Sequence, residues 1–68
     1  MVDTNKLKGA MVRAGFSQIS LAKRLGMSKN TLNAKLNGKA KISTDEAKFM
    51  CEVLGIETEK EKIEIFLT

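Results

Sequence analysis

The stretch of sequence that decides the fold is residues 17–38, which read SQISLAKRLGMSKNTLNAKLNG. It contains two short runs of helix-forming residues, and each run follows a serine that can accept a hydrogen bond from a free backbone N–H group. These serines are Ser17 and Ser28, and Gly26 lies between the runs, where glycine permits the tight turn that ends a helix. We therefore predict two helices joined by a tight turn, over residues 18–25 and 29–37. Their apolar faces are Leu21, Ala22 and Leu25 in the first helix and Leu32 and Leu36 in the second.

Apolar spacing predicts further helices on both sides of this segment. On the N-terminal side, one helical stripe holds Leu7, Ala10, Met11 and Ala14, Asp3 or Thr4 can cap its start, and Gly15 follows as a helix breaker. On the C-terminal side, Ser43 and Glu46 have the spacing of a capping box, in which each side chain satisfies a backbone donor. The helix that follows it is expected to turn Ala47, Met50, Cys51 and Leu54 inward and to end at Gly55.

The last stretch, residues 56–68, allows two interpretations. Ile63, Phe66 and Leu67 lie on one helical face, whereas Ile63, Ile65 and Leu67 fit the alternation of a strand. We favour a short fifth helix. The chain has 68 residues, which is enough for one domain over residues 1–68, and its composition favours helix over strand. The sequence thus predicts an all-α domain, a compact bundle of four to five helices.

The charged residues are distributed unevenly along the chain. Residues 6–41 contain nine lysines and arginines and no acidic residue, whereas residues 42–68 contain seven acidic residues and three basic ones. Such a run can be a solvated surface and nothing more. However, carboxylates repel phosphate, so a long stretch without them is what a surface that faces a polyanion requires.

The composition argues against several classes of protein. The chain has no histidine and a single cysteine, so neither a zinc cluster nor an internal disulfide is expected, and no nucleophile–base pair for an enzyme is evident. No cofactor or small-molecule ligand is expected. The N-terminal residues do not resemble a signal peptide, and no apolar run approaches the length of a membrane span, so we expect a soluble, cytoplasmic protein. RNA binding is poorly supported, because no set of exposed aromatic residues for base stacking is evident.

Residues 17–32 resemble the helix-turn-helix of the phage lambda-type repressor and Cro proteins, the XRE family. Small Ala22, turn residue Gly26 and apolar Leu32 fall at that family's register, and Leu36-Asn37-Gly38-Lys39 looks like the end of its recognition helix. The resemblance extends through Leu54-Gly55-Ile56 and is weak after Glu57. It implies a lambda-repressor-like, helix-turn-helix DNA-binding domain.

The resemblance also implies roles for individual residues. The start of the recognition helix meets base edges in the major groove. The residues implied to contact bases are Lys29, Asn30, Thr31, Asn33 and Ala34. Those implied to contact phosphates are Gln18, Ser28, Lys35, Asn37, Lys39 and Lys41. Any of these polar residues could instead be ordinary surface, and Thr31 could bond locally.

The chain departs from the family in one respect. Many relatives join the first helix to the recognition helix by a buried arginine–glutamate pair, and the corresponding residues here look like Met11 and Leu36. An apolar contact is expected in its place, which is often neutral or stabilising.

Together these features predict a sequence-specific transcriptional regulator that occupies double-stranded operator DNA, encoded by a phage or other mobile element. A homodimer is expected, and the tail residues Ile63, Ile65, Phe66 and Leu67 are its candidate interface, although they could equally complete the core of the monomer. The main alternative is a protein-interaction module such as an antitoxin or antirepressor, in which the acidic C-terminal third binds a partner protein.

Overall fold

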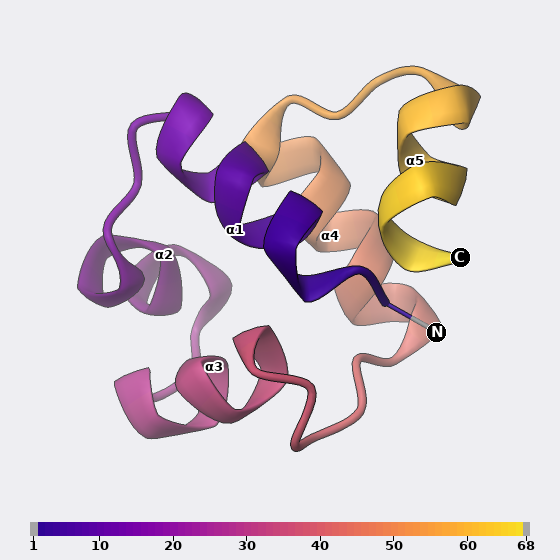
Figure 1. Ribbon diagram of the computed structural model, residues 1–68. Coiled ribbons are helices and arrows are strands. Elements are labelled where there is room, and N and C mark those ends of the chain that lie inside the picture. Colours follow the sequence, from indigo (N-terminus) through magenta and orange to yellow (C-terminus); the bar gives the residue numbers. More distant parts are fainter. Residues whose placement is uncertain (1, 68) are drawn as a thin grey trace.

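The computed structural model describes residues 2–67, and within this range all regular structure is helical. The helices are α1 (Thr4–Arg13), α2 (Gln18–Leu25), α3 (Lys29–Leu36), α4 (Thr44–Leu54) and α5 (Glu59–Phe66). In Figure 1, α2 and α3 lie on one side of α1, α5 lies on the other side, and α4 crosses behind. The predicted all-α class is confirmed, and so are the helix over 18–25 and the start of the helix at Lys29. α3 ends one residue earlier than expected, because Asn37 is its C-cap.

The helix starts are set by short polar side chains, as the sequence predicted. Ser17, Ser28 and Ser43 each accept a hydrogen bond from the backbone N–H three residues later, and Glu46 completes the expected capping box at α4. At α1 the cap is Asp3, and Thr4 is already helical. The turn between α2 and α3 begins at Gly26, whose φ of 72° is a left-handed conformation that favours glycine.

The core is formed by apolar residues from all five helices. Its buried members, including Ile56 from the segment between α4 and α5, are Leu7, Ala10, Met11, Leu21, Ala22, Leu32, Leu36, Met50, Cys51, Leu54, Ile56 and Ile65. Met11 and Leu36 are both in this cluster. Burial also raises the pKa of the Cys51 thiol. Ala14, which we expected to face inward, is exposed, because α1 ends at Arg13 and Ala14 is its C-cap.

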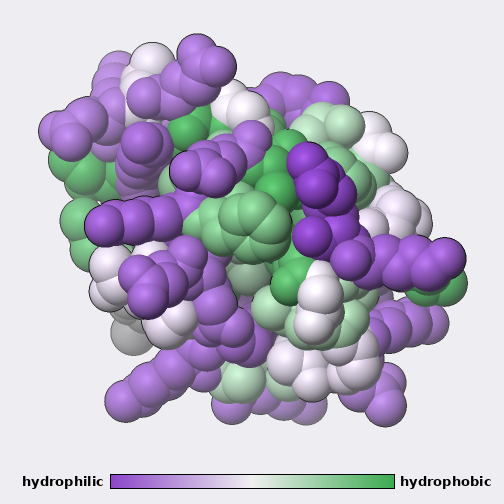
Figure 2. Space-filling view, turned by 180° about the vertical axis from the view of Figure 1, so that it is seen from behind, coloured by the Kyte–Doolittle hydropathy of each residue, from purple (hydrophilic) through white to green (hydrophobic). Residues whose placement is uncertain are grey.

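Figure 2 shows the face of the molecule opposite to that in Figure 1, where hydrophilic side chains surround smaller hydrophobic areas.

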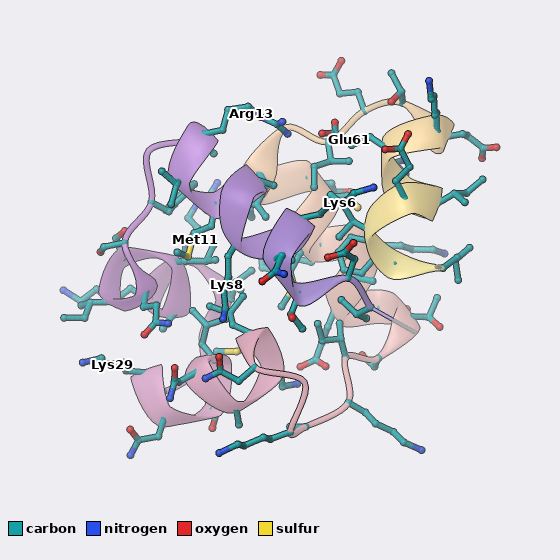
Figure 3. All side chains as sticks on the ribbon, in the orientation of Figure 1. Lys6, Lys8, Met11, Arg13, Lys29 and Glu61 are labelled. Carbon is teal, nitrogen blue, oxygen red and sulfur yellow. The ribbon has the colours of Figure 1, made fainter. Side chains whose placement is uncertain are left out.

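The C-terminal stretch is a helix, so the strand interpretation is wrong, and its inward face differs from the predicted one. Ile65 is 2% exposed, whereas Ile63 is 49% and Leu67 72% exposed. The end of α5 lies against the start of α1, where the backbone N–H of Asp3, the N-cap of α1, donates to the carbonyl oxygen of Ile65 at 2.6 Å. Two ion pairs also join these helices, Lys6–Glu64 at 3.5 Å and Arg13–Glu61 at 2.6 Å (Figure 3). Ile65 therefore belongs to the core of the monomer and is not a candidate interface residue.

A third ion pair joins α3 to the start of α4. The Lys35 ammonium lies 2.5 Å from Oε2 of Glu46, and Oε1 of the same carboxylate accepts the backbone N–H of Ser43 at 3.0 Å. The hydrogen bond from Lys35, followed by that from Ser43, lowers the pKa of Glu46. One carboxylate thus caps α4 and joins α3 to its start.

Among the described residues, no helix is long and apolar enough to cross a membrane.

Glu46→Gln should remove part of the acid sensitivity of the fold. Because the pKa of Glu46 is lowered in the folded chain, the unfolded chain, with a pKa near 4.5, binds the proton more tightly. The stabilisation is therefore fully present above the unfolded-state pKa and is lost as the pH falls through the folded-state pKa. Urea denaturation should show a smaller loss of unfolding free energy on acidification for Glu46→Gln than for the wild type.

Lys35→Met removes the other partner and should change the pH profile in the same direction but by less, because the hydrogen bond from the Ser43 N–H still lowers the pKa of Glu46. If both variants lose as much stability on acidification as the wild type, the ion pair makes no contribution to it.

Candidate nucleic-acid interface

The packing of α3 determines which of its side chains are free. Leu32 and Leu36 are 0% exposed and lie one helical turn apart, so they place one face of α3 against the core. Lys29, Asn30, Thr31 and Asn33 are exposed and Ala34 is half-buried. In Figure 3, Lys29 extends away from the body of the molecule at the start of α3. The residues expected to contact bases therefore form the outer surface of this helix.

The starts of α2 and α3 have no acidic residue in their first turns. Free backbone N–H groups give a helix N-terminus a partial positive charge, which attracts anions such as phosphate. By contrast, α4 and α5 carry acidic residues in their first turns, which offset that charge. The first turn of α1 has no acidic residue either, but its N-cap is Asp3, whose carboxylate offsets the charge there. The starts of α2 and α3 are therefore the helix N-termini that attract an anion most strongly.

Three amide side chains and one ammonium form a continuous hydrogen-bonded chain across α1, α3 and α2, which we call the amide relay. Lys8 Nζ donates to Asn37 Oδ1 at 2.9 Å, and Asn37 Nδ2 donates to Asn33 Oδ1 at 3.1 Å. Gln18 Nε2 donates to the same oxygen of Asn33 at 3.3 Å. Figure 3 shows Lys8 reaching from α1 toward α3. The structure thus brings Gln18, Asn33 and Asn37 together, and adds Lys8, which sequence reasoning had not assigned to the site.

Ser28 and Thr31 are bonded to each other. The Ser28 hydroxyl donates to Thr31 Oγ1 at 2.9 Å and accepts the backbone N–H of Thr31 at 3.1 Å. The hydroxyl proton of Ser28 is therefore used within the cap, whereas that of Thr31 is free to donate outward. Two side-chain hydrogen bonds thus hold the first turn of α3 at the place where it would meet a base.

Lys35 differs from the expectation that it contacts phosphate. Its side chain is only 11% exposed, and its ammonium is paired with Glu46. A phosphate contact there would require this partly buried pair to be broken. We therefore leave Lys35 out of the proposed contact set and assign it to the packing of α3 on α4.

The other basic residues of the stretch 6–41 differ in whether their charge is paired. Of the nine basic residues in 6–41, Lys6, Arg13 and Lys35 are ion-paired and Lys8 belongs to the amide relay. The other five are exposed and have no ion-pair partner within residues 2–67, namely Lys23, Arg24, Lys29, Lys39 and Lys41. Lys29 lies at the start of α3, and Lys39 and Lys41 follow its end. The positive charge that stays unpaired thus includes both ends of α3.

Comparison with known protein families gives one match. A family model described as a helix-turn-helix matches residues 7–60, which span most of α1, all of α2, α3 and α4, and the start of α5. Comparisons with curated proteins and with solved structures gave no significant match.

Lys39→Ala and Lys41→Ala should each weaken binding to a mixed-sequence DNA duplex and reduce the slope of log affinity against log salt by about one, as expected for the loss of one phosphate contact. Lys35→Ala is the matched control, because its ammonium is already paired, and it should leave the slope unchanged. Fluorescence anisotropy over a salt series measures both quantities. A flat salt dependence of the wild-type chain, or an equal change for Lys35→Ala, would contradict this interface.

Proposed function

We propose that the chain recognises specific operator sequences by placing α3 in the major groove. The premise is its family: it belongs to the lambda-repressor-like helix-turn-helix family of DNA-binding transcription regulators. The observation that carries this proposal is the polar outer surface of α3, with an unpaired lysine, Lys29, at its start and two more, Lys39 and Lys41, after its end. The major groove admits an α-helix, and each base pair presents a distinct pattern of donors and acceptors there.

The proposed base contacts come from the start and the outer face of α3. Asn30 is the residue best placed to recognise adenine, because an amide can accept from N6 and donate to N7, and Asn30 is exposed. Lys29 can donate to the O6 and N7 atoms of guanine. Thr31 can donate through its free hydroxyl proton, and Ala34 presents a methyl group that suits the thymine methyl.

The proposed phosphate contacts surround this surface. Gln18 begins α2, Asn37 caps the end of α3, and Lys39 and Lys41 lie in the loop that follows. Contacts to phosphate fix the position and angle of the protein on the duplex but carry no sequence information directly. Occupation of the operator by such a protein would regulate a promoter without chemistry, by hindering access of the polymerase.

Asn30→Ala tests sequence recognition directly. The probe is a duplex that the wild-type chain enriches from a library with a randomised central segment. Loss of a bidentate contact costs about 1–3 kcal/mol, so the affinity for this duplex should fall by roughly 5- to 150-fold, while binding to unrelated DNA stays nearly constant. Asn5→Ala, which removes an exposed asparagine from α1, is the matched control and should bind as the wild type does. If the wild type enriches no sequence, or if Asn30→Ala keeps the wild-type preference, base recognition by α3 is wrong.

We further propose that the chain acts as a homodimer through the exposed side of α5. Ile63 and Leu67 are exposed and lie one turn apart, with the Leu67 N–H donating to the Ile63 carbonyl oxygen at 2.9 Å. Phe66 and Leu67 also line a groove of about 830 Å³ between α4 and α5. A two-fold dimer would present two copies of α3 to half-sites about 34 Å apart, the length of one turn of DNA.

Leu67→Lys should dissociate the dimer, because it places a charge at the centre of the proposed apolar contact. Sedimentation equilibrium without DNA should give a dimer for the wild type and a monomer for this variant. Val12→Lys is the control, since Val12 is equally exposed at 69% but lies on α1, and it should stay dimeric. A monomeric wild type, or an unchanged mass for Leu67→Lys, would refute this interface.

A further inference from the structure

In the amide relay the hydrogen bonds run in one direction, from Lys8 to Asn37 and from Asn37 to Asn33, and Lys8 determines this direction. An ammonium group has three donors and no acceptor, so the Asn37 side chain must turn its carbonyl oxygen toward Lys8. The NH₂ group of Asn37 then points to Asn33, which must present its own oxygen in turn. Gln18 donates to this same oxygen from the other side. Each amide in the relay therefore has its orientation determined by the one before it, beginning at a cation on α1.

The relay determines which polar group of Asn33 is free to bind another molecule. Its oxygen accepts two hydrogen bonds within the protein, so its NH₂ group is what remains for another molecule. Turning the amide over would place its NH₂ group against the NH₂ groups of both Asn37 and Gln18. Gln18 could turn as well, but Asn37 could not without placing its donors against the Lys8 ammonium. A turned Asn33 amide would lose both hydrogen bonds that its oxygen accepts from Asn37 and Gln18 and would bring donors face to face, so the observed orientation is favoured.

We propose that Lys8 is a positioning residue for sequence specificity: through Asn37 it holds Asn33 as a hydrogen-bond donor, so that Asn33 selects guanine over adenine. This inference rests on the proposed function. Guanine presents two acceptors in the major groove, O6 and N7, whereas adenine presents the N7 acceptor beside the N6 donor. A free asparagine suits adenine because it offers both a donor and an acceptor. Asn33 offers only the donor, so the N6 group of adenine would find no acceptor on it.

The test compares the sequences enriched from a randomised duplex library by the wild type and by variants of Asn33, Lys8 and Lys6. Asn33→Ala identifies the operator position that depends on Asn33. Lys8→Met keeps the aliphatic stem of the side chain but removes the donors that set the direction of the relay. Lys8→Arg restores a donor-only cation. Lys6→Met removes the same charge from the same helix and breaks only the exposed pair with Glu64, so it controls for the general loss of attraction to DNA.

The readout is the ratio of guanine to adenine at the position that Asn33→Ala identifies, which does not depend on overall affinity. We expect the wild type, Lys8→Arg and Lys6→Met to prefer guanine there. In Lys8→Met the preference should fall by about fivefold, the effect of one hydrogen bond, while preferences at other positions persist. Thermal melting of each variant confirms that it is folded.

The outcomes separate the two proposals. A wild type that enriches no sequence would overturn the proposed function, and with it this inference. A wild type that does enrich a sequence, but whose Asn33-dependent position carries adenine or cytosine, would overturn the inference alone. So would a Lys8→Met profile equal to that of the wild type, or an Asn33→Ala profile with no altered position.

Discussion

The burial of Leu32 and Leu36 is the constraint on which the rest of this structure depends. Both side chains are inaccessible to solvent, and their spacing of one turn gives α3 a single orientation in the bundle. Truncating a buried leucine to alanine typically costs about 2–5 kcal/mol, a large share of the stability of so small a domain. Rotation of α3 to expose another face is therefore strongly unfavourable. Because α3 is held in one orientation, Asn30 and Asn33 lie on its exposed face.

Electrostatics then distinguishes the two ends of the molecule. The acidic residues of the C-terminal third are not simply a solvated surface, since Glu61 and Glu64 pair with α1 and Glu46 pairs with α3. The two pairs with α1 are largely exposed, so each contributes little to stability, whereas Lys35–Glu46 is partly buried. Their effect is on the distribution of charge, because they neutralise basic residues away from the outer surface of α3 and leave Lys29, Lys39 and Lys41 unpaired beside it.

Features with local signals could be predicted from the sequence. The capping serines, Gly26 and Gly55 mark where helices start and stop, and the spacing of Leu32 and Leu36 marks the inward face of α3. The face of α5 was predicted wrongly, because its short apolar set fits more than one periodicity. Ile65 is buried where α5 lies against the start of α1, and the Asp3 N–H that bonds to its carbonyl oxygen is distant in sequence. Lys35 and Lys8 illustrate the same limit, because their partners Glu46 and Asn37 have no local pattern that would identify them.

The central claim is that the outer face of α3, held by its buried leucines, is the surface that meets DNA. The most direct test is to titrate the isotope-labelled chain with a duplex that it selects and to follow the NMR signals of the backbone and side-chain amides. The account predicts that the largest shifts occur at Lys29, Asn30 and Asn33 and at the Gln18 side chain, while α5 changes little. Shifts confined to α4 and α5, with the side-chain amides of Asn30 and Asn33 unmoved, would contradict it.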